Sequence, residues 1–132
     1  MEDKKITLRV IIEIMGSPKD HVEKTMQLVL EKFKKEYAVK KEDLTEATQV
    51  KQFWSTFVEL EAEIDKLDQL TAICFDYLPS SVEVIGPTSL EIKNQSISDL
   101  MNDLLAKLHR YDMVLKNLNA ENILLKKQTK SK

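Results

Sequence analysis

The sequence contains very little cysteine, glycine and proline: one cysteine, two glycines and three prolines in 132 residues. With Cys74 as its single cysteine, the chain cannot form an internal disulfide, which is typical of proteins that fold in a reducing cytoplasm. Gly16 and Gly86 fall between patterned segments, where a folded chain places its turns. The composition therefore excludes a disulfide-stabilised fold and favours a cytoplasmic location.

An excess of charge of one sign is also missing. The chain has 20 lysines and arginines against 22 aspartates and glutamates, a net charge of −2. Such a balance predicts no strong attraction to nucleic acid or to an acidic membrane surface. No apolar run has the length of a membrane-spanning helix, and the first residues are charged rather than signal-like. We therefore expect no nucleic-acid partner and no membrane association.

The residues that usually carry catalysis or bind metals are few and scattered. His21 and His109 are far apart, and neither has a second metal ligand three or four residues away. Cys74 falls on the apolar stripe of a predicted helix with no histidine near it in sequence, which indicates a buried structural thiol. No glycine-rich loop is present to hold a phosphate. We expect a non-enzymatic protein with no catalytic residues, no metal site and no cofactor.

Two segments show the alternation of a strand, residues 6–15 and 53–65. The predicted covered faces are Ile6, Leu8, Val10, Ile12 and Ile14 in the first, and Trp54, Thr56, Val58, Leu60, Ala62 and Ile64 in the second. A weaker pattern over 39–52 predicts an edge strand in which Leu44, Thr48 and Val50 face a core. Residues 81–85 predict a short strand, which residues 90–92 extend as a ragged edge.

Apolar residues recur at helical spacing after each of the two clear strands. Ser17 is the expected N-cap of the first helix, with Pro18 as its first residue. The stripe of this helix is Val22, Met26, Val29, Leu30, Phe33 and Tyr37. The second helix begins near Lys66 and ends at Pro79, with the stripe Leu67, Leu70, Ile73, Cys74, Tyr77 and Leu78. The order predicts an α+β, ferredoxin-like βαββαβ sandwich over residues 1–94, with two helices on one face of a four-stranded antiparallel sheet.

Residues 95–132 predict a long coiled-coil helix with a frayed basic tail. Its a and d positions are Ile97, Met101, Leu104, Leu108, Tyr111, Leu115, Leu118, Asn122 and Leu125. Asparagine at a single a position favours two parallel helices in register, and Glu121 and Lys126 then form an inter-chain ion pair. The chain's first partner is therefore itself, as a homodimer. We call the row of a and d positions from Ile97 to Leu125 the seam. Leu105 and Val114 are apolar residues beside the seam, and they leave open a higher oligomer or packing of the helix on its own domain.

The uncovered sheet face is a candidate partner face, with Ile11, Phe53 and Phe57 beside Glu59 and Glu61. RNA-recognition motifs share the element order and stack bases on such aromatics. The segment before Phe57 lacks the basic residue and glycine of that motif, and the glutamates would repel a phosphate backbone. An unknown protein is the better partner. A metal-dependent enzyme on the carboxylates of Glu59, Glu61 and Glu63 is an alternative.

The segment from Tyr77 to Pro87, followed by a leucine-rich helix ending near His109 to Tyr111, resembles the C-terminal extension found behind WYL domains in bacterial transcription regulators. That resemblance implies a ferredoxin-like fold with a role in oligomerisation and regulation. Gly86 departs from the family pattern, which has an acidic residue there. The wider topology resembles ACT-type regulatory domains, which implies small-molecule sensing as an alternative. We expect an interaction or regulatory module that self-associates through its last helix.

Overall fold

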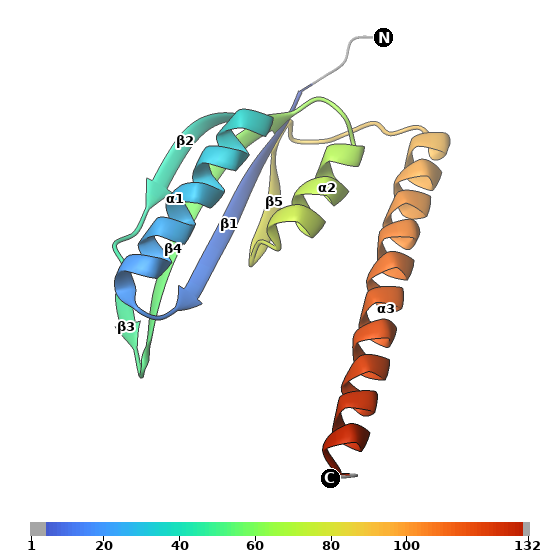
Figure 1. Cartoon of the computed structure of the whole chain (residues 1–132). Coiled ribbons are helices and arrows are strands. Elements are labelled where there is room, and N and C mark those ends of the chain that lie inside the picture. The colour runs from blue at the N-terminus through green and yellow to red at the C-terminus, as the bar shows by residue number, and fades with distance from the viewer. Residues whose placement is uncertain (1–4, 131–132) are drawn as a thin grey trace. The chain divides into compact units, whose positions relative to one another are not determined.

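The computed structural model describes residues 5–130, and the chain divides into two units between Ile92 and Lys93 (Figure 1). The elements in order are β1 (Ile6–Gly16), α1 (Lys19–Glu36), β2 (Ala38–Leu44), β3 (Thr48–Val50), β4 (Phe53–Ile64), α2 (Asp68–Tyr77), β5 (Ser81–Gly86) and α3 (Asn94–Lys130). The first unit is thus a sheet with two helices, and the second is the single helix α3. The protein is of the α+β class.

The sheet is antiparallel, with five strands rather than the expected four. The order across it is β2-β4-β1-β5, and β3 pairs with the beginning of β4 on the same side as β2. β1 and β4 run together along their whole length, from Ile6 opposite Ile64 to Gly16 opposite Trp54. β1 and β2, which α1 connects, are not neighbours, because β4 lies between them.

The core lies on one face of this sheet, under both short helices. The predicted alternation in β1 and β4 is confirmed, since Leu8, Val10, Val58 and Leu60 are all fully buried. The same two strands add Ile6, Ile12, Ala62 and Ile64 to the core. The two short helices, with the C-cap residue of α1, add Met26, Leu30, Phe33, Tyr37 and Ile73. Burying a side chain of this size stabilises the fold by roughly 1.5–3 kcal/mol. The stripe of α1 and the faces of both long strands are therefore as expected.

Three aromatic rings join the end of α1 to the end of α2. The ring of Phe33 lies 5.0 Å from those of both Tyr37 and Tyr77, measured between centroids. Tyr77 donates a hydrogen bond to the carboxylate of Glu36, and the ammonium of Lys32 lies 5.4 Å from the Tyr77 ring. Burial, followed by the hydrogen bond to Glu36, raises the pKa of Tyr77, so the phenol stays protonated. The helix ends are held by packing and polar contacts together.

The predicted helix start at Ser17 is wrong. Pro18, in an extended conformation, occupies the N-cap position of α1, and no side chain caps the helix there. An extended proline delays the first helical residue to Lys19. At the start of α2, the Gln69 side chain instead accepts hydrogen bonds from the backbone of Asp65 and Lys66, at 2.9 and 3.0 Å.

The predicted edge strand over 39–52 exists, but it is broken. Leu44 lies on the expected core side, opposite the buried Val58, whereas Thr48 and Val50 pair with Ser55 and Phe53 on the open face, so the expected inward face is wrong for these two. Residues 45–47 separate β2 from β3, and Leu44 and Val50 are 37% and 43% exposed. Ala47, in the break, is the residue that turns inward and is buried. Thr45 fixes the break to β4, since its hydroxyl and its backbone N–H both donate to the carbonyl of Phe57, at 3.0 and 2.9 Å.

Two further expectations are wrong. Cys74 and Leu78 are exposed, because the short α2 turns Thr71 inward beside the expected Ile73. Residues 90–92 form no strand, and Leu90 packs against the core as an irregular segment. α3 continues to Lys130, and the fraying of its basic end stays a prediction. Residues 131–132 lie outside the described chain.

Replacing Phe33 by alanine tests the core. The side chain is fully buried between α1, α2 and the sheet, so Phe33→Ala should lower the free energy of unfolding by about 3–5 kcal/mol. Leu28→Ala on the same helix is the control, since Leu28 is 66% exposed and should change stability little. Urea denaturation followed by circular dichroism measures both. Equal losses for the two variants would contradict the assignment of the core.

Candidate interaction surfaces

The apolar seam of α3 is exposed along its length. α3 has 37 residues and is about 55 Å long. Exposure along the seam runs from 38% at Leu104 to 62% at Leu115 and Leu125. A shallow groove along the last part of the helix is lined by Leu115, Leu118, Asn119, Glu121, Asn122 and Leu125. An apolar stripe of this length is unusual on the surface of an isolated chain.

Residues beside the seam include charged groups with partners in their own helix. Lys107 Nζ lies 3.1 Å from Asp103 Oδ1, and Lys116 Nζ lies 2.9 Å from Asp112 Oδ2. The partners of each pair lie one helical turn apart; Lys116–Asp112 is exposed and Lys107–Asp103 is partly buried. Pairs of this kind stabilise a helix only slightly. Leu105 and Val114, also beside the seam, are about half exposed. The helix surface is therefore broadly apolar around its seam.

The uncovered face of the sheet is charged toward the β5 edge and the end of β4. Arg9 Nη1 donates to Glu83 Oε1 at 2.9 Å, and Arg9 Nε lies 3.9 Å from Glu59 Oε1. Lys40 Nζ lies 2.6 Å from Glu63 Oε1. The hydrogen bond from Lys40 is the main reason why the pKa of Glu63 lies below its usual value. Several of the predicted clustered carboxylates are thus paired with cations.

The other end of the same face is apolar. Phe53 and Phe57 of β4 are 42% and 44% exposed, and Met15 of β1 is 52% exposed. Val50 of β3 lies directly opposite Phe53. Between them, the Ser55 hydroxyl donates to Glu13 Oε2 at 3.0 Å. The structure brings the predicted residues Ile11, Phe53, Phe57, Glu59 and Glu61 to one face. Val50 lies on this face as well, although the sequence pattern over 39–52 predicted that Val50 would face the core.

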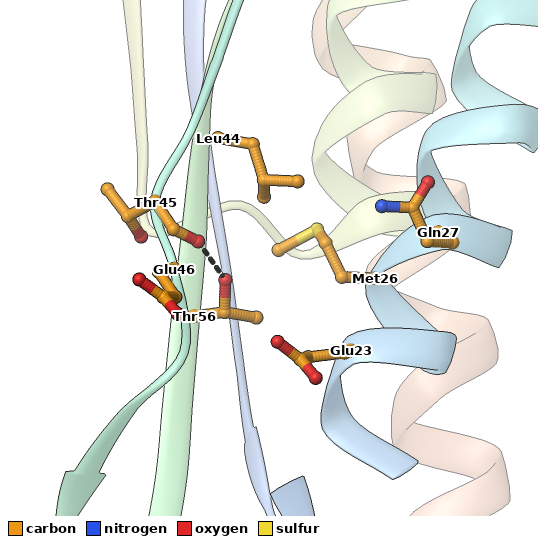
Figure 2. A pocket seen from close by; sticks show the side chains of 7 residues that line it. All are labelled: Glu23, Met26, Gln27, Leu44, Thr45, Glu46 and Thr56. Carbon is orange, nitrogen blue, oxygen red and sulfur yellow. Dashed lines mark hydrogen bonds between the residues drawn. The ribbon is translucent and has the colours of Figure 1, made fainter. Parts of the chain in front are cut away.

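A small cavity lies on the opposite, helix-covered side, where the edge strand is broken (Figure 2). Its volume is about 250 Å³, and it is lined by Glu23, Met26, Gln27, Leu44, Thr45, Glu46 and Thr56. The Thr56 hydroxyl donates to the Thr45 carbonyl at 2.7 Å, as Figure 2 shows. These seven side chains include carboxylates, hydroxyls and an amide but no cationic group or thiol. Sequence patterns did not indicate this cavity, because it depends on the break in the edge strand.

The candidate reactive residues do not come together. His21 and His109 are both exposed. Among residues 5–130, the structure contains no group of three or more histidines, cysteines, aspartates and glutamates that could hold a metal ion. Cys74 is exposed, yet apolar surroundings on one side raise the pKa of its thiol, which lowers its reactivity at neutral pH. None of the helices in the described chain is long and apolar enough to cross a membrane.

A family model matches residues 7–129, so the match covers both the sheet unit and most of α3. The chain belongs to the MJ0538 family. No curated protein and no solved structure matches the chain. The family match therefore spans parts of both units of the chain.

Replacing Glu63 by glutamine tests the ion pairs of the sheet face. Because the pKa of Glu63 is lowered in the folded state, its carboxylate stabilises the fold above the ordinary carboxylate pKa. That stabilisation is lost as the pH falls through the lowered value. The difference in unfolding free energy between the parent and Glu63→Gln should therefore be present at neutral pH and vanish in acid.

Urea titrations at a series of pH values measure this difference. Lys40→Met should reduce it in the same way, because Lys40 supplies the main hydrogen bond to Glu63. A difference that persists unchanged at pH values well below the lowered pKa would show that Glu63 acts through packing rather than charge.

Proposed function

We propose that the chain is a non-enzymatic interaction or regulatory module that self-associates through α3 as a parallel, two-stranded coiled coil. The observation that carries this proposal is the exposed apolar seam from Ile97 to Leu125. Apolar residues spaced by three and four positions along one helix meet those of a second helix when two copies wind around each other. A second copy of α3 has the same seam and can cover it along its full length.

Asn122 favours the parallel arrangement. It is the one polar residue among the seam positions from Ile97 to Leu125. In a parallel, in-register pair, Asn122 faces Asn122 of the second copy, and the two amides can hydrogen-bond to each other. In an antiparallel pair, Asn122 would face an apolar residue, and its buried amide would lack a partner, which is costly.

The charges beside the seam support the same orientation. In a parallel pair, each g position lies near the e position five residues later on the other helix. Glu121 then meets Lys126, and Lys107 meets Asp112, so both charged pairs are attractive. Leu100 meets Leu105 and adds apolar contact. Lys107 and Asp112 already have partners within their own helix, so their inter-chain pairs share these charges.

We also propose that the sheet unit is ferredoxin-like and presents its open face to a protein partner. The strand order β2-β4-β1-β5 supports the fold, with β4 between the two strands that α1 connects and both short helices on one face. The exposed Phe53 and Phe57, next to paired charges, support the contact surface, because aromatic residues are enriched at protein interfaces. On this proposal, the dimer carries two such faces.

Charges placed in the seam should separate the dimer. Leu108→Asp with Leu115→Asp puts two carboxylates at facing a positions, and the molar mass in solution should fall to that of one chain, 15.3 kDa. Analytical ultracentrifugation measures this mass. Ala106→Asp with Met113→Asp is the matched control, because it adds the same charges at the same spacing on the outer side of the helix. A parent chain that is already monomeric, or a seam variant that remains dimeric, would refute the proposal.

Replacing Asn122 by leucine tests the parallel register. Leucine removes a buried polar pair from the seam, so the thermal unfolding temperature should rise. The same change removes the residue that selects two strands, and we expect species larger than a dimer to appear in ultracentrifugation. Lower thermal stability with a unique dimer would argue against facing asparagines. The control is Asn119→Leu, which makes the same substitution three residues earlier, at a position that is neither a nor d.

A further inference from the structure

The two edges of the sheet differ in how well they are protected against pairing with another strand. At one edge, β2 carries Lys40, Lys41, Glu42 and Asp43, has an irregular register between Val39 and Lys41, and is broken after Leu44. Charges, bulges and short lengths are the usual means by which proteins prevent edge strands from associating. This edge is protected.

The other edge strand of the sheet is β5 (Figure 1). This strand has far less protection than β2. Its sequence is Ser-Val-Glu-Val-Ile-Gly, and its one charged residue, Glu83, is neutralised by Arg9 of the neighbouring strand at 2.9 Å. Within residues 5–130, β5 pairs with β1 on one side. The outer side of β5 pairs with no strand of the described chain. One irregularity, between Thr7 and Leu8, leaves Ile85 without a partner in β1, so the regular part of the edge ends at Val84.

We propose that β5 pairs with β5 of a second copy, antiparallel across a two-fold axis, so that the two sheets of the dimer become continuous. This inference rests on the proposed self-association through α3. A parallel pair of α3 helices starts at the same end, and residues 87–93 between β5 and α3 can span at most about 25 Å. The two β5 strands are then held at a high effective concentration, of the order of millimolar.

The sequence of β5 selects the register of this pairing. Opposite residues must lie on the same side of the sheet, and a two-fold axis through Glu83 would put two carboxylates face to face. A two-fold axis through Val82 avoids this repulsion and keeps the paired residues before the irregular Ile85. Val82 then faces Val82 of the second copy, and Glu83 faces Ser81, whose hydroxyl can donate to the carboxylate. The two Glu83 side chains are diagonal neighbours, and each retains its Arg9 partner.

Val82 and Val84 gain apolar contact in this register. Val82 lies opposite the buried Val10 and packs at the margin of the core, and Val84 is 45% exposed on the same side. The backbone groups on the outer edge of β5 gain hydrogen-bond partners that replace water. The pairing therefore continues the sheet and its helix-covered layer from one copy into the next.

A cysteine at the two-fold axis tests this pairing. In a Cys74→Ser background, which removes the exposed native thiol, Val82→Cys should form a disulfide-linked dimer as the main species under mild oxidation, because the two Cβ atoms face each other. Val39→Cys is the matched control, since Val39 is also a half-buried edge valine at the margin of the core, but on β2. It should remain largely unlinked. Non-reducing electrophoresis measures both.

Mixing two single-cysteine chains gives a second measurement with exposed positions that leave the core intact. The register puts Val84 opposite Ser80 of the other copy, so Val84→Cys mixed with Ser80→Cys should give a linked heterodimer. If the parent is dimeric by mass but neither experiment gives a link above the Val39→Cys level, the β5 pairing is wrong and the α3 dimer stands. Val82→Cys can also be placed in the chain that carries Leu108→Asp and Leu115→Asp. If that chain stays dimeric and links equally well, the α3 proposal is wrong and the β5 pairing stands. A monomeric parent without links overturns both.

Discussion

The antiparallel pairing of β1 with β4 is the constraint on which the sheet unit depends. The two strands pair from Ile6 opposite Ile64 to Gly16 opposite Trp54, and this register places their apolar side chains in one continuous layer. A slip of one residue would turn that layer to the solvent, so burial fixes the register strongly. Both short helices pack on this layer, and β2, β3 and β5 each add to one of the two central strands.

The same pairing decides what the open face looks like. Because side chains alternate along a strand, burying one face of β4 leaves Phe53, Phe57 and Glu59 together on the other. Register across the sheet then puts Arg9 between acidic residues of two neighbouring strands. The face is consequently divided into a charge-paired part and an aromatic part. This division supports the proposed contact with a protein rather than with a polyanion, because the glutamates would repel the phosphates of a polyanion.

The proposed self-association through α3 gives the two edges of the sheet different roles. An exposed edge strand in a monomer can pair with any other exposed strand and so promotes aggregation. In a dimer with a two-fold axis, the same strand pairs with its copy, and no unpaired edge is left there for a third chain. The protected β2 and the less protected β5 are consistent with such a division of roles. The helix would supply the high local concentration, and the strand would fix the orientation of the two sheet units.

Much of this architecture was accessible from periodicity. The alternation in residues 6–15 and 53–65 identified the two central strands and their buried faces, because a strand covered on one side must alternate. The stripe from Val22 to Tyr37 identified α1 for the equivalent reason with a helical period. The a and d positions of the last helix identified a seam of unbroken spacing, because a long helix keeps its period whatever its partner.

Only the tertiary structure decided the features that depend on contacts between distant residues. The break at residues 45–47 arises because Thr45 bonds to β4 and Ala47 turns inward, and neither contact has a local signal in the sequence. The exposure of Cys74 depends on the rotation of a short α2, whose stripe was broad enough to permit two orientations. The unequal protection of the two edges follows from strand order. By itself, the sequence determined which faces are apolar, since that is a property of spacing along one element; which of them meet is decided by pairing across the sheet.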